Sequence, residues 1–132
     1  MTVAAARSRT AAGHAALAAA VEEARLRRTD LVVLHVIEGL TTEAGDEAAV
    51  HAEVAGELAG LEVGDLSWTL RTTAGGRDTA GSLVDLAVEV DAEMLVVGTR
   101  RRSPVGKLLL GSVVQRVLLD SPVPVMVVKP AV

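Results

Sequence analysis

The segment from Gly98 to Ser112 carries residue types that bind phosphate. Gly98 ends an apolar run typical of a buried strand, and a residue without Cβ lets a ligand approach the backbone. Gly111 and Ser112 come at the predicted start of a helix, where free N–H groups and the positive end of the dipole favour an anion. The loop between them adds the cationic donors Arg100, Arg101, Arg102 and Lys107.

Each of these features also has a plainer interpretation. A glycine and a serine at a helix start are often only a cap, and arginines on a loop are often solvated surface. Their combination after a buried strand favours an anion site, and both interpretations stay open at this point.

Two well-known nucleotide motifs are absent. A phosphate-binding loop of the NTPase type would need a glycine at 101 and a serine or threonine at 108, where the chain has Arg101 and Leu108. The dinucleotide pattern G-x-G-x-x-G does not follow the first predicted strand. The acids of a receiver domain are missing from the same place, since that strand ends in alanines.

The sequence contains no recognisable catalytic constellation. His35 lies in an apolar run and is expected to be a core residue with a hydrogen-bond partner, not a base. The spacing of His, Asp and Glu does not match a metal site, and no serine lies in a nucleophile-elbow motif. The acids of the predicted helices, Glu53 among them, are typical of solvated faces. We therefore expect a protein that is not an enzyme, with slow nucleotide hydrolysis as an open alternative.

Apolar periodicity predicts the elements that position these residues. Strands are predicted over 1–6, 30–36, 66–72, 94–97 and 123–128, and helices over 10–28, 47–61, 79–90 and 111–120. The continuous apolar run at 30–36 indicates a strand covered on both faces, and the alternation at 66–72 indicates a strand near the sheet edge.

The alternation of strands and helices predicts an α/β fold. We expect a three-layer α/β/α, flavodoxin- or Rossmann-like domain with a five-stranded, mostly parallel sheet, occupying residues 1–132 as a single domain. Ligands of such folds bind beyond the carboxyl ends of the strands, where the strand order reverses. The segment from Gly98 to Ser112 belongs to that edge.

The amino-acid composition limits the cellular compartments and the binding partners that can be expected. Half of the residues are hydrophobic, yet Phe and Tyr are absent and Trp68 is the single tryptophan, so the core must be built from Ala, Val and Leu. No apolar stretch of about 18 residues is present, which predicts no membrane partner. A net charge of −4 argues against nucleic acid, and no secretory signal is visible. The expected location is the cytoplasm.

Three blocks of sequence resemble the universal stress protein family, within the adenine nucleotide alpha-hydrolase-like superfamily. They are Leu31-Val32-Val33-Leu34-His35-Val36, the segment from Val96 to Val113, and Ser121-Pro122-Val123-Pro124-Val125-Met126-Val127-Val128. The similarity covers nearly the whole chain and is densest from Asp85 onward. It implies a non-catalytic stress-response module that binds an adenine nucleotide, ATP or AMP, with Mg²⁺ accompanying ATP.

The resemblance also implies site residues, and it shows two departures. Nucleotide-binding members carry G-x-x-G, nine residues, then G-(S/T); Gly98, Gly111 and Ser112 match, and Arg101 replaces the second glycine. An Asp near the adenine in binding members is Ala6 here. By the same matching, the expected nucleotide-binding residues are Ser8, Val36, Gly98, Arg100, Arg101, Gly111, Ser112 and Val113.

The last predicted strand suggests a homodimer. An apolar strand at a sheet edge is a liability if it is left open, and pairing with its symmetry mate would cover it. The resemblance implies dimerisation through the same strand, with Val123, Val125 and Val127 at the interface. The alternative to a nucleotide-binding dimer is a nucleotide-independent interaction and regulatory dimer, which the changes at Ala6 and Arg101 favour.

Overall fold

The computed structural model has the alternation of strands and helices that the sequence predicts. It describes residues 1–39, 43, 45–76, 78–99 and 110–130. Its strands are β1 (Thr2–Arg7), β2 (Asp30–Ile37), β3 (Trp68–Ala74), β4 (Ala92–Gly98) and β5 (Val125–Val128). Its helices are α1 (Ala11–Leu26), α2 (Asp46–Ala59), α3 (Thr79–Glu89) and α4 (Ser112–Asp120).

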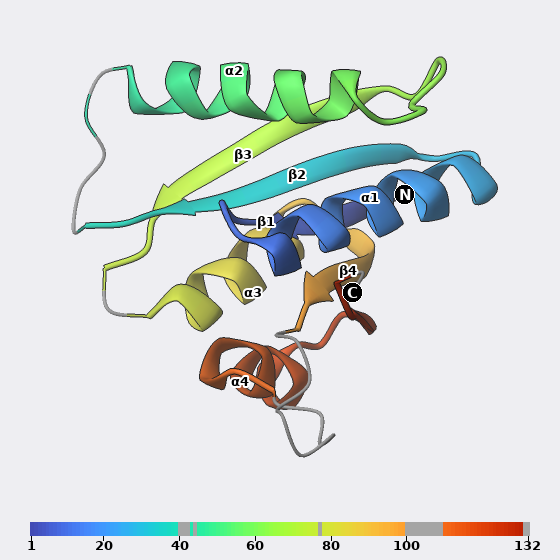
Figure 1. Ribbon diagram of the computed structural model, residues 1–132. Coiled ribbons are helices and arrows are strands. Elements are labelled where there is room, and N and C mark those ends of the chain that lie inside the picture. The colour runs from blue at the N-terminus through green and yellow to red at the C-terminus, as the bar shows by residue number, and fades with distance from the viewer. Residues whose placement is uncertain (40–42, 44, 77, 100–109, 131–132) are drawn as a thin grey trace.

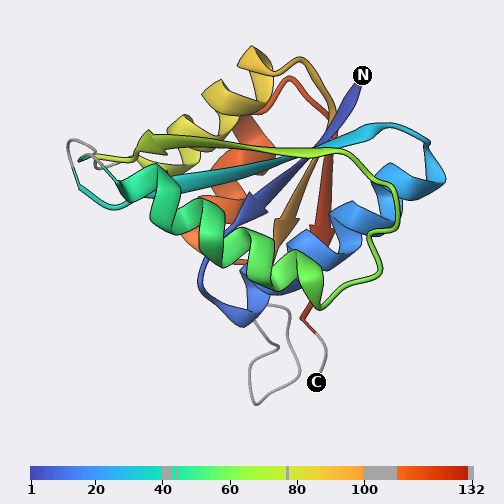
Figure 2. The ribbon, with the colours of Figure 1, turned by 90° about the horizontal axis from the view of Figure 1, so that it is seen from above.

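The strands form one five-stranded sheet in the order β3-β2-β1-β4-β5. Every strand pair in it is parallel, and the arrowheads of β1, β4 and β5 point the same way in Figure 2. The chain runs from β1 towards β3 on one side and then returns to place β4 on the other side of β1. The strand order therefore reverses between β1 and β4.

Helices cover both faces of the sheet and complete the three predicted layers (Figure 1). The apolar faces of α1 and α2 pack on one side, over alternate residues of the strands such as Val3, Ala5 and Val33. Those of α3 and α4 pack on the other side, over the intervening residues such as Ala4 and Val32. The alternation of a β-strand thus divides the core into two apolar layers.

Small residues bring α1 very close to the centre of the sheet. Ala16, Ala20 and Ala24 are fully buried along its inner face. At its first turn the contact is closer still, because a Cβ on Gly98 would collide with the backbone of Ala12. The glycine that ends β4 is therefore required by helix packing, a reason that the sequence does not reveal.

One difference from the predicted boundaries lies at the end of β1 and changes the environment of a charged residue. The first strand was expected to end at Ala6, but it includes Arg7, which pairs in register with His35 and is only 4 % exposed. A charged residue after an apolar run looks like the start of a loop. Here it stays in the strand because partners elsewhere in the chain neutralise its charge.

The remaining boundaries shift by only a few residues. Thr10 caps α1, Asp78 caps α3 and Gly111 is the N-cap of α4, all at the predicted helix starts. The strand β3 lies at a sheet edge, as predicted, and β5 begins two residues later than expected. Within the described residues, no helix has the length and hydropathy that a bilayer span requires.

Two glycines with opposite surroundings test the packing at β4. We expect Gly98→Ala to lower the free energy of unfolding by about 2–3 kcal/mol, because α1 must move to admit the methyl group. Gly56→Ala is the control, since its site within α2 is open, and it should raise stability by about 0.5–1 kcal/mol. Urea unfolding followed by the fluorescence of Trp68 measures both. Equal effects of the two substitutions would contradict the packing argument.

Candidate functional site

A pocket of about 510 Å³ opens where the strand order reverses. The ends of β1, β2 and β4 form its floor, and the first turns of α1, α3 and α4 surround it. Most of the site residues expected from the sequence line it together: Ser8, Val36, Gly98, Gly111, Ser112 and Val113. Arg100 and Arg101 lie outside the described residues.

The helices that begin at this pocket differ in how their first amides are satisfied. In α1, the Thr10 side chain accepts from the Gly13 amide at 3.1 Å. In α3, the Asp78 carboxylate accepts from the Gly81 amide at 2.9 Å. The N-cap of α4 is Gly111, which has no side chain, and no other described side chain caps this helix. The first turn of α4 therefore offers N–H groups to a ligand.

A backbone acceptor lies at the end of β2. The Ile37 carbonyl accepts from the Gly75 amide at 2.9 Å, so the polar groups of Ile37 point towards β3. Successive residues of a strand point their carbonyls to opposite sides, so that of Val36 points towards β1. Because β1 ends at Arg7, opposite His35, the Val36 carbonyl lies past the last residue of β1. Val36 lines the pocket, and its carbonyl can accept from a ligand there.

Apolar side chains make up the inner wall between these two polar ends. They are contributed by the strands and by the buried faces of α3 and α4: Ala6, Val36, Val97, Leu83, Val114 and Val117. No carboxylate or amide side chain lines the pocket within the described part of the chain. The position expected to hold an acid, Ala6, thus adds a methyl group to an apolar wall. This wall suits a flat, weakly polar group, such as a nucleobase.

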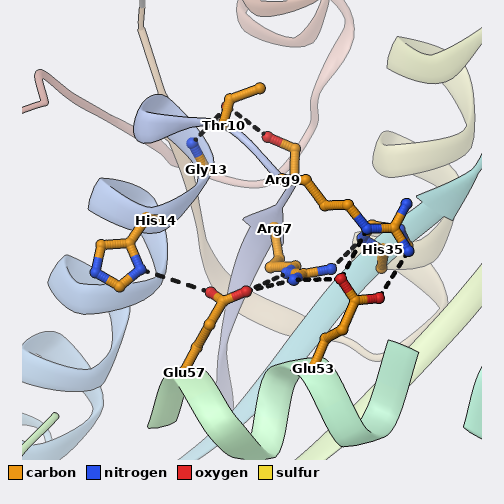
Figure 3. Close-up of polar contacts among 9 residues, drawn as sticks. Arg7, Arg9, Thr10, Gly13, His14, His35, Glu53 and Glu57 are labelled. Atoms are coloured by element: carbon orange, nitrogen blue, oxygen red, sulfur yellow. Dashed lines mark hydrogen bonds and ion pairs between the residues drawn. The ribbon is translucent and has the colours of Figure 1, made fainter. Parts of the chain in front are cut away.

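Beside the pocket lies a charged cluster that the sequence analysis missed. The guanidinium of Arg7 is buried against α2, where its Nε donates to the Glu57 carboxylate at 3.0 Å and a second nitrogen forms an ion pair with the same group (Figure 3). Its Nη1 lies 3.3 Å from Nδ1 of His35, and its Nη2 lies 3.6 Å from the Glu53 carboxylate. Arg7 also lines the pocket.

The Glu53 side chain is 39 % exposed, as expected for a solvated helix face, and it is also held by two arginines. Arg9 binds it with two parallel bonds, Nε to Oε1 at 2.8 Å and Nη2 to Oε2 at 2.7 Å. Its hydrogen bonds to Arg9, aided by the charges of Arg9 and Arg7, lower the pKa of the Glu53 carboxyl to about 2. The sequence held one signal of this cluster. Glu53 and Glu57 are one turn apart on a helix, where like charges repel unless cations lie between them.

His35 is a buried core residue, as predicted, and the cluster keeps it neutral. Burial lowers its pKa first, and the positive charges of Arg7 and Arg9 lower it further. A neutral ring can accept a hydrogen bond from Arg7 through Nδ1. No group of three or more His, Asp and Glu side chains suited to a metal ion occurs among the described residues.

Comparison with known proteins gives a consistent result. The family model described as the universal stress protein family matches residues 1–129. A universal stress protein of Mycolicibacterium smegmatis is 41 % identical over an alignment of 124 residues, and the match covers 89 % of this chain and 89 % of that protein.

Solved structures give the same match in three dimensions. A universal stress protein from Archaeoglobus fulgidus superposes with a TM-score of 0.70 at 31 % identity, over 97 % of this chain and 96 % of that one. Another structure, the universal stress protein from Archaeoglobus fulgidus in complex with dAMP, has a TM-score of 0.67 at 26 % identity. It covers 97 % of this chain and 95 % of that one.

The neutral state of His35 makes stability depend on pH. Because its pKa in the folded protein is lowered from 6.5, the unfolded chain binds more protons, and stability falls as the pH drops below 6.5. In His35→Asn an amide oxygen can accept from Arg7 without titrating. Between pH 7.5 and 5 (pH values chosen about the ordinary histidine pKa), we expect a smaller loss of unfolding free energy in the variant than in the parent. Equal losses in urea unfolding would show that His35 does not contribute.

Proposed function

Because the chain belongs to the universal stress protein family, we propose that it is a non-catalytic, homodimeric stress-response module that binds an adenine nucleotide between β1 and β4. The observation that carries the proposal is the first turn of α4, which no described side chain caps and which opens into an apolar pocket with an acceptor at its other end. The related protein in complex with dAMP supports the choice of ligand.

The phosphate end of the ligand is assigned to α4. Amides of Ser112 and Val113 point from an uncapped helix start, where the dipole favours negative charge. Both residues are exposed, and Gly111 next to them has an extended backbone with φ −66°. Arg100 and Arg101 belong to the segment before this helix, and we propose that they pair with the phosphates. With ATP, Mg²⁺ would accompany the phosphates; with AMP, none is needed.

The base end is assigned to Val36. Its carbonyl can accept from the exocyclic amine of adenine, and the apolar wall around Ala6 can pack against the ring. Since Ala6 offers no acceptor, this contact is weaker by about 1 kcal/mol, or roughly fivefold in affinity, than one that also has a carboxylate. Ser8 and Gly98 would lie beside the sugar and phosphates, on either side of the strand reversal. We therefore expect binding weaker than that of members with the acid.

Dimerisation is proposed through the open edge of β5. The Leu95 amide donates to the Pro124 carbonyl and the Thr99 amide to the Val128 carbonyl, so even-numbered residues of β5 face β4. The polar groups of Val125 and Val127 consequently point outwards, where a second copy of the chain could pair with them. The N–H that Pro124 lacks would point towards β4, so the proline leaves the outer edge intact. The half-buried side chain of Val123 extends the apolar edge beyond the strand.

Location and partners follow from the same proposal. We propose that the dimer acts in the cytoplasm, with a nucleotide and a second copy as its partners and without binding nucleic acid or membrane. The net charge of −4 supports the exclusion of nucleic acid.

Capping α4 with a side chain tests the nucleotide site. In Gly111→Asp, the carboxylate would accept from the first amides of α4, so we expect helix stability to rise by a few tenths of a kcal/mol and nucleotide binding to be lost. Gly111→Ala, which adds no cap and no charge, is the control and should retain most of the binding. Isothermal titration with AMP, ATP and cyclic AMP measures affinity. No heat from the folded parent at millimolar nucleotide would contradict the proposed function.

A single proline tests the dimer. Val127→Pro removes an amide from the outer edge of β5 and leaves the bonds to β4 in place, so we expect the variant to sediment as a monomer. Val127→Thr keeps the amide and should remain dimeric. Sedimentation at micromolar protein decides the matter, with thermal melting to confirm the fold, and a monomeric parent would contradict the dimer.

A further inference from the structure

The turn that follows β1 is anchored at two points on a helix that does not line the pocket. Ser8, which lines the pocket, lies between Arg7 and Arg9, and each of these arginines binds a carboxylate of α2 (Figure 3). We propose that Arg7 and Arg9 are positioning residues, and that the affinity of the pocket is regulated through the position of α2. This proposal rests on the nucleotide site proposed above.

The inner anchor is buried and fixed from several sides. The Arg7 side chain is 2 % exposed and is bound by Glu57 of α2, while His35 of β2 lies against its Nη1. A buried guanidinium that lost its carboxylate would be an uncompensated charge, so α2 cannot leave the sheet without disturbing the end of β1. That end forms part of the pocket floor.

The outer anchor, the pair Arg9–Glu53, is exposed to solvent. The Arg9 side chain is 62 % exposed and is bound to Glu53 through two bonds. Glu53 and Glu57 are four residues apart on α2, and Arg7 and Arg9 are two residues apart at the end of β1. Two carboxylates one helical turn apart on α2 thus bind the arginines on either side of Ser8, and we expect this to hold the turn at two points.

Ser8 has little freedom once its neighbours are held. Its hydroxyl lies 2.8 Å from that of Thr10, and its backbone packs so closely on α1 that a Cβ on Gly13 would collide with it. A shift of Arg9 would therefore move Ser8 together with the first turn of α1. Both form one wall of the pocket.

By thermodynamic linkage, docking of α2 and binding of nucleotide must affect each other equally. If docking of α2 favours the pocket geometry that binds nucleotide, nucleotide must favour docking of α2 by the same free energy. A partner that competes for the Glu53 carboxylate would then lower nucleotide affinity without touching the nucleotide.

The sign of one charge substitution tests this proposal. Removing a negative charge near an anionic ligand should tighten binding if charge alone matters, whereas loosening the turn should weaken it. We expect Glu53→Gln to weaken AMP binding about fivefold or more in isothermal titration. Arg9→Gln should weaken it similarly, and the double variant should be no weaker than either single variant, because both remove one interaction. Unchanged or tighter binding by Glu53→Gln overturns the proposal.

A matched control and a measurement without ligand complete the test. Glu47→Gln removes the same charge from an exposed site on α2 and should bind AMP as the parent does. Without ligand, amide exchange over residues 8–14 should be faster in Glu53→Gln than in Glu47→Gln; equal exchange overturns the positioning role. If the parent does not bind AMP, the proposed function fails, and the exchange result still decides whether the arginines hold the turn.

Discussion

The site depends on the gap between the carboxyl ends of β1 and β4, where the strand order reverses and the pocket opens. The crossover after β1 passes over one face and the crossover after β4 over the other, so neither helix covers the carboxyl ends of both strands. Three helices begin around that gap, and their dipoles all direct positive potential into it. Two of these helices are capped by Thr10 and Asp78, whereas no described side chain caps α4, where we propose that an anion binds.

Close packing around this gap restricts which residues the chain can carry there. Gly98 and Gly13 are needed where α1 meets β4 and the turn after β1, because a Cβ at either position would collide with backbone. An alanine-rich inner face lets α1 approach this closely. Because the packing is this close, we expect a shift of the Arg9–Glu53 pair to move Ser8 and the first turn of α1, which form one wall of the pocket. We propose that stability and nucleotide binding are linked through the residues at the end of β1.

Most of the secondary structure and the helix caps could be predicted from the sequence, because they depend on residues that are close together in the chain. Apolar periodicity predicts the strands and helices, and the continuous run at β2 correctly indicates a strand covered on both faces. The cap residues Asp78 and Gly111 could also be predicted, because a cap affects only the first turn of the helix that follows it. The role of Arg7 could not be predicted in this way, because its burial depends on Glu57, fifty residues later on another element. Its place within β1 follows from that long-range pair and not from the residues next to it.

We propose that α4 and β2 hold opposite ends of one anionic ligand. Titration of ¹⁵N-labelled protein with AMP, followed by the amide resonances, tests it most directly. We expect the largest shifts on the amides of Ser112 and Val113 and, together with them, on Ile37, whose amide nitrogen is bonded to the Val36 carbonyl carbon. Shifts that leave the first turn of α4 unchanged, or that gather on a face away from the strand reversal, would contradict it.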